Sequence, residues 1–283
     1  MSFIQWLLGL FSKKKDSFPA PPAQTSPAVP VRSAPIPVIT PTPVVPVQPP
    51  ANSHPDEPGP ILGIDVSHYQ DTVDGADARA KGYRFLIAKA TDGTTDRVDY
   101  MLAKHKAVAR QFDFIFTCYH FFRYDHDPLA QARQLLAAAG PIEKGDLPLC
   151  LDVEWDNASK DLGYHDSDHG GTRGTLDDAG ADKAYACLVE IEKQSGMTPM
   201  LYTNPYFFTG FRNPERFQRF LPWLSAYTTT ESKVHLCKPW PRLVFWQNTE
   251  HLRMKGSNGK IIEDVDGNKF EGSLNALRAL CKQ

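Results

Sequence analysis

The stretch LPLCLDVE, residues 147–154, alternates between two kinds of side chain. Successive side chains of a β-strand point to opposite faces, so Leu151 and Val153 share one face while Asp152 and Glu154 share the other. The apolar face is suited to packing against helices, which leaves the acidic face to point into a barrel. In α/β barrels, functional residues gather where the parallel strands end. The stretch therefore predicts a barrel strand with two carboxylates near its C-terminal end.

Seven further stretches rich in β-branched, aromatic and apolar residues predict strands, and helical patterns lie between them. We predict strands at 61–67, 84–90, 114–121, 199–203, 222–227, 243–247 and 261–266, and helices at 100–112, 128–139, 177–195 and 274–280. Alternating strands and helices imply parallel strands joined by crossovers, and eight strands suggest closure into a barrel. The connections 228–242 and 249–260 are too short for a regular helix. We therefore expect an α/β fold, a single (β/α)8-like barrel that is irregular, flattened or incomplete.

The prolines divide the chain near residue 60. Fifteen of the 24 prolines lie between Ser17 and Pro60, in a stretch with few aromatic or charged residues. Such a composition cannot bury a core, so we expect residues 16–60 to be a disordered, proline-rich linker. The remaining residues, 61–283, match the roughly 200 to 250 residues of one α/β barrel.

An apolar segment precedes the linker. Residues 3–11, FIQWLLGLF, are followed at once by lysines at 13–15. A secretory signal has its positive charge before the apolar run, and a membrane span needs about 20 residues, so we expect neither a cleavable signal peptide nor a span. We expect residues 1–15 to contact a membrane surface as an interfacial helix. A segment that docks on a partner protein explains the same pattern.

Charge and motif content exclude several classes of protein. The formal net charge is −2, which argues against binding of nucleic acid. Neither GxGxxG, GxxxxGK[ST] nor GxSxG occurs, and the five cysteines show no CxxC spacing, so we expect buried free thiols. The segment from His165 to His169 contains two histidines and two aspartates, but no HExxH-type helix orients them. We expect a monomer with no metal and no cofactor.

Four acids are predicted to meet at the end of the barrel. Asp65 ends one predicted strand and Asp266 another, and both are expected to join Asp152 and Glu154. Each acid alone can be structural, capping a helix or pairing with a lysine such as Lys89. Crowded carboxylates raise one another's pKa, so one of them can stay protonated as a general acid. This arrangement suits glycoside hydrolysis, in which one acid protonates the leaving oxygen.

Aromatic residues near the predicted strand ends are consistent with a carbohydrate ligand, although packing in the core explains any single one of them. They are Tyr69, Tyr119, Trp155, Tyr202, Trp223, Tyr227 and Trp246. The residues that we expect to contact the sugar are Tyr119, Tyr202, Lys89, Trp223, Trp246 and Asn268.

Eight motifs of the chain resemble, in order and spacing, the family 25 glycoside hydrolases. They are GIDVSHYQ (63–70), FLIAKATDG (85–93), YHFFR (119–123), LDVEWD (151–156), PMLYTNPYF (199–207), LPWLSAYT (221–228), FWQNT (245–249) and VDGNKFEG (265–272). These are Chalaropsis-type lysozymes, found among phage endolysins and bacterial and fungal muramidases. The resemblance covers 61–283 and implies a β5α3-type barrel that cleaves the β-1,4 bond between N-acetylmuramic acid and N-acetylglucosamine in peptidoglycan.

The resemblance also implies roles for the acids. Glu154 is similar in position to the general acid/base, and Asp152 to the residue that orients the substrate's N-acetyl group in a neighbouring-group route with retention. Asp65 and Asp266 would complete the acidic cluster. A direct aspartate nucleophile is the rival mechanism, and the sequence does not decide between the two because it gives no carboxylate separation.

Two other functions fit parts of the pattern. A chitinase-like glycosidase also ends a strand in DxE, but Pro148 and Cys150 stand where its longer DxxDxDxE pattern has aspartates. A non-catalytic cell-wall-binding module is the second alternative, although none of the paired acids is missing. The predicted place of action is the bacterial cell wall, in the periplasm or outside the cell, with peptidoglycan as the partner.

Overall fold

The computed structural model describes residues 56–94, 97–155, 178–211 and 213–283. The predicted segment 1–15, nearly all of the linker 16–60 and the loop from His165 to His169 lie outside these residues. None of the helices in the described ranges has the length and apolar character needed to cross a bilayer.

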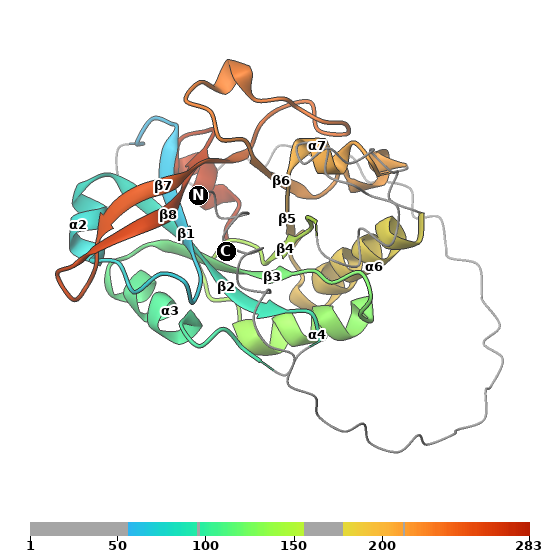
Figure 1. The fold of residues 1–283 in the computed structure, drawn as a ribbon, viewed down its shortest axis with the longest axis horizontal. Helices are drawn as coiled ribbons and strands as arrows, with labels where there is room; N and C mark the ends of the chain where they lie inside the picture. Colours follow the sequence, from blue (N-terminus) through green and yellow to red (C-terminus); the bar gives the residue numbers. More distant parts are fainter. Residues whose placement is uncertain (1–55, 95–96, 156–177, 212) are drawn as a thin grey trace, which may run out of the picture. The chain divides into compact units, whose positions relative to one another are not determined.

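Eight strands form one closed barrel in chain order (Figure 1). They are β1 (Ile61–Val66), β2 (Tyr83–Asp92), β3 (Ile115–Phe121), β4 (Cys150–Asp152), β5 (Met200–Thr203), β6 (Leu221–Ser225), β7 (Phe245–Lys255) and β8 (Ile261–Phe270). All eight predicted strands are confirmed. The expectation of an incomplete barrel is wrong, because β8 pairs with β1 and closes the sheet.

The direction of the last strand differs from the prediction. Strands β1 to β7 are parallel, whereas β8 is antiparallel to both β7 and β1. Residues 256–260 join β7 to β8, and so short a link allows only a hairpin. The middle of β8 therefore lies at the mouth of the barrel, where β1 to β7 end. Asp266 lies there, and not at the C-terminal end of its strand as predicted.

Asp264 does not share a face with Asp266 and Asn268. Its backbone has a positive φ of 56°, which interrupts the regular alternation of the strand. Its side chain is 75% exposed and contacts His251 at 2.9 Å. Asp264 is therefore turned out of the barrel.

The helices lie around the outside of the strands (Figure 1). They are α2 (Gly75–Ala80), α3 (Leu102–Gln111), α4 (Pro128–Ala139), α6 (Asp178–Ser195), α7 (Pro205–Phe208) and α8 (Leu274–Ala279). The side chain of Asp127 caps the N-terminus of α4, and Gly140 ends that helix with a φ of 68°. After β5 the connections hold only α7 and two short 3-10 helices, Pro214–Phe217 and Glu231–Lys233. The predicted irregularity of the second half is confirmed.

Side-chain alternation separates an inner core from an outer core. Along β2, Phe85 and Ile87 point into the barrel, while Leu86 and Ala88 pack against the helices. The outer core also holds Ile64, Val66, Leu149, Leu151 and Val153, as the sequence predicts. The polar residues between them are thus directed toward the barrel interior.

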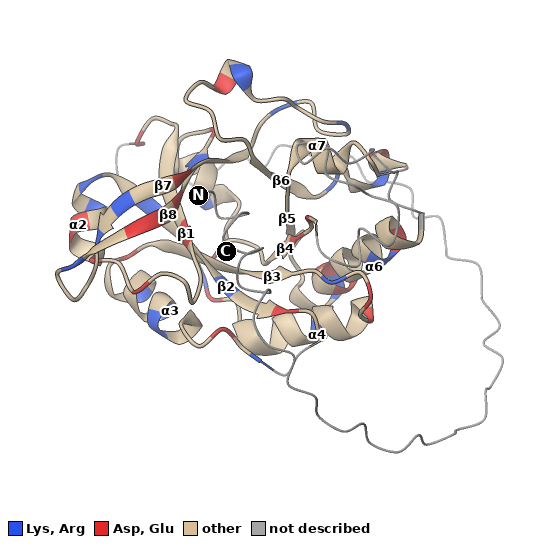
Figure 2. Ribbon diagram, viewed as in Figure 1, with Lys and Arg blue, Asp and Glu red and all other residues tan. Residues whose placement is uncertain are grey.

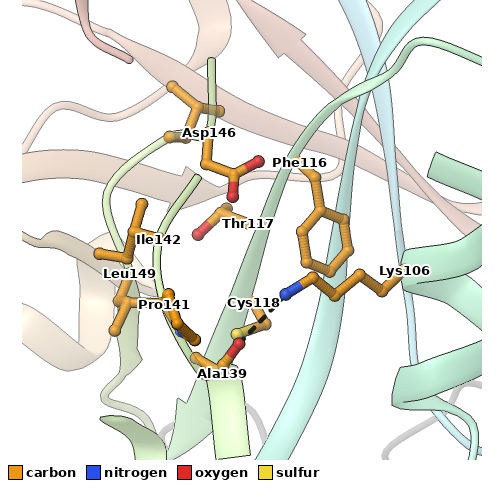
Figure 3. A pocket seen from close by; sticks show the side chains of 10 residues that line it. Lys106, Phe116, Thr117, Cys118, Ala139, Pro141, Ile142, Asp146 and Leu149 are labelled. Carbon is orange, nitrogen blue, oxygen red and sulfur yellow. Dashed lines mark hydrogen bonds between the residues drawn. The ribbon is translucent and has the colours of Figure 1, made fainter. Parts of the chain in front are cut away.

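All five cysteines are buried and free, which confirms the prediction of buried thiols. Burial raises the pKa of Cys118 to about 12. The thiol lines a small cavity where Lys106 Nζ donates to the carbonyl oxygen of Ala139 at 3.2 Å (Figure 3). The cavity volume is about 10 Å³, which is room for no more than one water molecule. It is therefore not a substrate site.

Candidate active site

Two aspartates face each other across the strand pair that closes the barrel. Asp65 on β1 and Asp266 on β8 are register partners. Figure 2 shows acidic residues, in red, around β1 and β8. Asp65 is only 4% exposed, and its carboxyl group forms a hydrogen bond with that of Asp266. Two carboxyl groups form such a bond only when one of them is protonated. The pair therefore shares one proton.

Asn268 fixes the orientation of Asp65. Its Nδ2 donates to Asp65 Oδ2 at 2.6 Å, and its Oδ1 accepts from Trp223 Nε1 at 2.7 Å. An indole nitrogen is only a donor, so it leaves the amide of Asn268 one orientation, with the nitrogen toward Asp65. The prediction placed Trp223 and Asn268 against the sugar, and here both support an acid.

Gln247 supports the same carboxylate from the other side. Its Nε2 donates to Asp65 Oδ2 at 3.1 Å, and its Oε1 accepts from the hydroxyl groups of Tyr202 at 2.8 Å and Tyr227 at 3.2 Å. Sequence reasoning missed Gln247. The available signal was its place beside Trp246 on a barrel strand, which puts the two side chains on opposite faces.

Burial and the hydrogen bonds from the two amides have opposite effects on the pKa of Asp65. Burial raises the pKa of Asp65 to about 6, although the hydrogen bonds from Asn268 and Gln247 lower it. Burial also raises the pKa of Asp266 well above its usual range, and the charge of Asp65 adds to this effect. We conclude that Asp266 carries the shared proton and that Asp65 is the ionised partner.

A second pair of acids stands at the end of β4. Asp152 is the last residue of the strand and is 5% exposed, while Glu154, two residues later, is partly exposed. Burial raises the pKa of Asp152 well above its usual range, and the nearby charge of Glu154 raises it further. Asp152 Oδ1 is buried and forms no hydrogen bond with any described residue. A buried carboxylate oxygen without a donor is unusual, and it marks a place for a donor from a ligand.

Lys89 forms an ion pair with Asp92. Its Nζ lies 3.1 Å from Asp92 Oδ2, and Arg123 also pairs with Asp92, at 2.7 Å. The charge of Lys89 lowers the pKa of Asp152, against the larger effect of burial. Lys89 is therefore a neighbour of the β4 acids, and whether it contacts a sugar stays a prediction.

Tyr119, Tyr202 and Trp223 form an aromatic group beside the acids. The rings of Tyr202 and Trp223 meet edge to face with centroids 4.6 Å apart, and those of Tyr119 and Trp223 are 6.3 Å apart. Trp246 lies elsewhere, in the outer core, where its Nε1 donates to the carbonyl oxygen of Ala226 at 2.7 Å. The structure does not bring Trp246 to the acids, because strand alternation points it away from the barrel interior.

Metal ligation finds no support in the part of the chain that the structure describes. No group of three or more His, Cys, Asp or Glu side chains there is arranged to hold an ion. The four acids form two pairs: Asp65 and Asp266 are hydrogen-bonded to each other, whereas Asp152 and Glu154 are linked by the repulsion between their charges. The site thus offers proton-carrying carboxyl groups beside an aromatic surface.

Comparison with known proteins decides the family. The family model described as "Glycosyl hydrolases family 25" matches residues 64–257, which include three of the four acids, Asp65, Asp152 and Glu154. The chain belongs to glycosyl hydrolase family 25. The resemblance proposed from the eight motifs is confirmed.

Relatives within glycosyl hydrolase family 25 agree in activity name and in fold. The N,O-diacetylmuramidase of Chalaropsis sp is 28% identical over 218 residues, or 74% of this chain and 97% of the relative. The N,O-diacetylmuramidase of Arthroderma benhamiae is 28% identical over 241 residues, or 79% of this chain and 88% of the relative. The solved muramidase from Acremonium alcalophilum superposes with a TM-score of 0.61 at 27% identity, covering 78% of this chain and 98% of that one.

Proposed function

We propose that this chain is a peptidoglycan muramidase that hydrolyses the β-1,4 bond between N-acetylmuramic acid and N-acetylglucosamine. The observation that carries the proposal is the meeting of two carboxyl pairs at the barrel mouth, where burial raises the pKa of Asp65, Asp266 and Asp152. The family and the activity named for the relatives supply the substrate. They favour this function over a chitinase-like glycosidase and over a non-catalytic wall-binding module.

Glu154 is the proposed general acid. It is partly exposed and follows the end of β4, so it can approach a glycosidic oxygen, whereas Asp152 is buried. The repulsion between the two carboxylates favours one proton on the pair. In the free protein burial favours the proton on Asp152, and an N–H donated by the substrate to Asp152 favours the ionised form of Asp152 and leaves the proton to Glu154.

We propose that Asp152 positions the substrate's 2-acetamido group. Its unpartnered Oδ1 accepts the acetamido N–H, and its charge stabilises the cation that forms. The acetamido carbonyl oxygen attacks the anomeric carbon while Glu154 transfers its proton to the leaving oxygen. Water then attacks the anomeric carbon and gives a proton back to Glu154. Two displacements at one carbon give net retention, which separates this route from a single inverting displacement.

Asp65, hydrogen-bonded to the protonated Asp266, is proposed to stabilise positive charge at the sugar ring. The hydrogen bonds from Asn268 and Gln247 lower the pKa of Asp65 and favour its ionised form near neutral pH. A fixed negative charge in a water-poor site stabilises a developing oxocarbenium centre more than it would in water. Tyr119 and Tyr202 are proposed to line the sugar subsites beside it.

The place of action proposed is the bacterial cell wall, with residues 1–15 at a membrane surface and 16–60 as a tether. Asp56 Oδ1 accepts from the backbone N–H of Asn275 at 2.9 Å, and Glu57 pairs with Arg84 at 2.8 Å. The last residues of the proposed tether thus contact the barrel. Deletion of 1–15 should abolish sedimentation with anionic vesicles, and unchanged sedimentation would reject the anchor.

A zymogram on purified peptidoglycan tests the activity. The wild type should clear the substrate, and Glu154→Gln should lower the rate by at least about a hundredfold, because the general acid is lost. Glu263→Gln, at a side chain 64% exposed on β8, is the matched control and should clear normally. No clearing by folded wild-type protein rejects the function, and full clearing by Glu154→Gln rejects the assigned acid.

A further inference from the structure

Two cations share one carboxylate near the β4 acids, and Lys89, Asp92 and Arg123 are here called the charge triad. Arg123 Nε donates to Asp92 Oδ1 at 2.7 Å and its Nη2 to Oδ2 at 3.0 Å, whereas Lys89 Nζ reaches Oδ2 alone, at 3.1 Å. A guanidinium that binds both oxygens of a carboxylate forms the stronger and better oriented pair. Arg123 is therefore the main partner of Asp92, and the triad keeps one positive charge, on Lys89.

The charge triad packs around Phe121, which lies next to Asp152 in the sheet. Lys89 Nζ is 5.1 Å and Arg123 Cζ is 4.4 Å from the centroid of the Phe121 ring. Phe121 on β3 is the register partner of Asp92 on β2 and of Asp152 on β4. The Lys89 side chain is only 14% exposed, so water and salt screen its charge little. One strand thus separates the triad from Asp152.

Gln131 on α4 fixes the backbone of Arg123. Its Oε1 accepts from the Arg123 backbone N–H at 2.8 Å, and its Nε2 donates to the Arg123 carbonyl oxygen at 2.9 Å. His120 Nε2 lies 3.0 Å from the same Oε1, and His120 Nδ1 lies 2.7 Å from Thr91 Oγ1. Because an amide oxygen only accepts, His120 carries its proton on Nε2 and accepts from the Thr91 hydroxyl group at Nδ1. All three supporting side chains are buried, so the Arg123 side chain starts from a rigid position.

Carboxylates outnumber cations around Asp152. Burial raises its pKa most, and the charges that act on it further are those of three carboxylates, which raise it, and of one cation, which lowers it: Glu154, Asp65, Asp92 and Lys89. Burial also raises the pKa of three neighbouring groups on β3, β4 and β5 well above their usual range, which leaves them uncharged: Tyr119, Cys150 and Tyr202. Within this set only Lys89 favours an ionised Asp152, and Asp92 opposes it.

We propose that Arg123 is a positioning residue for the reaction, because by holding both oxygens of Asp92 it leaves the charge of Lys89 to act on Asp152. Ionisation of Asp152 then costs less when Glu154 carries the proton of the pair. Without Arg123, Asp92 would cancel the charge of Lys89 and would add its own to the carboxylates around Asp152. The inference rests on the proposed function, in which Asp152 reacts as the ionised partner.

The test compares pH profiles of kcat/KM on soluble glycan strands, which report the ionisation of the free enzyme. Arg123→Gln should move the whole profile to higher pH and lower kcat/KM at pH 5 about tenfold, because the acid pair holds its protons more tightly. Arg123→Lys keeps a cation beside Asp92 and should restore most of the wild-type profile. Asp92→Asn removes a carboxylate and should move the profile to lower pH. Arg133→Gln, which makes the same change of charge at a side chain 59% exposed on α4, is the matched control.

Opposite shifts from Arg123→Gln and Asp92→Asn support the proposal, since damage to the fold does not move a profile in two directions. If Arg123→Gln does not fold, the direction of the shift in Asp92→Asn decides. An equal loss at every pH, an unshifted profile, or an equal shift in Arg133→Gln overturns the role of Arg123 and leaves the muramidase intact. Wild-type protein that cleaves no glycan strand rejects the proposed function, and the inference with it.

Discussion

Asp65 and Asp266 are direct partners across the antiparallel pair β1 and β8, and their carboxyl groups are hydrogen-bonded to each other. The contact depends on β8 running against the other strands, since this brings the middle of β8 to the mouth. It buries two acids with one proton between them. Such an arrangement costs stability at neutral pH, and it keeps a charge available for a reaction.

The pH dependence of stability should reflect Asp65. Its pKa in the folded protein is about 6, raised from the ordinary value of 3.8, so the folded state binds the proton more tightly than the unfolded chain. The free energy of unfolding should therefore fall as the pH rises from 4 through 6, by up to about 3 kcal/mol. Asp65→Asn should flatten this fall because the titrating carboxyl group is removed. The carbonyl oxygen of the new amide still accepts from Asn268 and Gln247. Urea denaturation at several pH values measures it, and equal slopes in both proteins would contradict the account.

Gln247 should act as a positioning residue for Asp65. Gln247→Leu leaves Asp65 and Tyr202 without a shared partner, which should lower the free energy of unfolding by about 1–3 kcal/mol. We expect kcat to fall at least tenfold while KM changes little, because the acid loses its orientation. Gln218→Leu, at an exposed glutamine, is the control. A variant that is destabilised but keeps full kcat would show that Gln247 is only structural.

The thiols should be inert in the folded protein. All five cysteines are buried, and burial raises the pKa of Cys118, Cys237 and Cys281 to about 12. Thiolate is the reactive form, so an aromatic disulfide reagent should label none of them at pH 8. It should label five after denaturation. Fast labelling of the native protein would show that a thiol is more accessible than the structure indicates.

Asp152 should control both the rate and the pH range of the reaction. Asp152→Asn removes the charge that stabilises the proposed cation, and we expect kcat to fall at least a hundredfold. The alkaline limb of the pH–rate profile of the remaining activity should shift to lower pH. Removal of the neighbouring charge lowers the pKa of Glu154, so the general acid loses its proton more easily. Asp182→Asn, at a side chain 63% exposed on α6, serves as the control. An unshifted profile would mean that Asp152 and Glu154 do not share a proton.

Much of the barrel followed from the alternation of side chains. The faces of residues 61–67 and 147–154 were predicted because each places apolar residues at every second position and acids between them. Those acids were identified for the same reason. Each acid alone can be structural, and it was their predicted convergence on the polar faces at the strand ends that marked Asp65 and Asp152.

The rest required three-dimensional information. The direction of β8 depends on a hairpin turn at 256–260 and on the positive φ of Asp264, and neither has a strong sequence signal. Gln247 was missed because a single amide carries no chemical signature until its partners are known. Trp246 was assigned to the sugar by residue type, while strand alternation places it in the outer core.

Analysis of the new reducing ends in digested peptidoglycan tests the central claim most directly. Wild-type protein should release fragments that end in N-acetylmuramic acid, with the β-anomer formed first, and Glu154→Gln should leave reducing ends near background. Fragments that end in N-acetylglucosamine would contradict the proposed bond. Undiminished release by Glu154→Gln would contradict the assignment of the general acid.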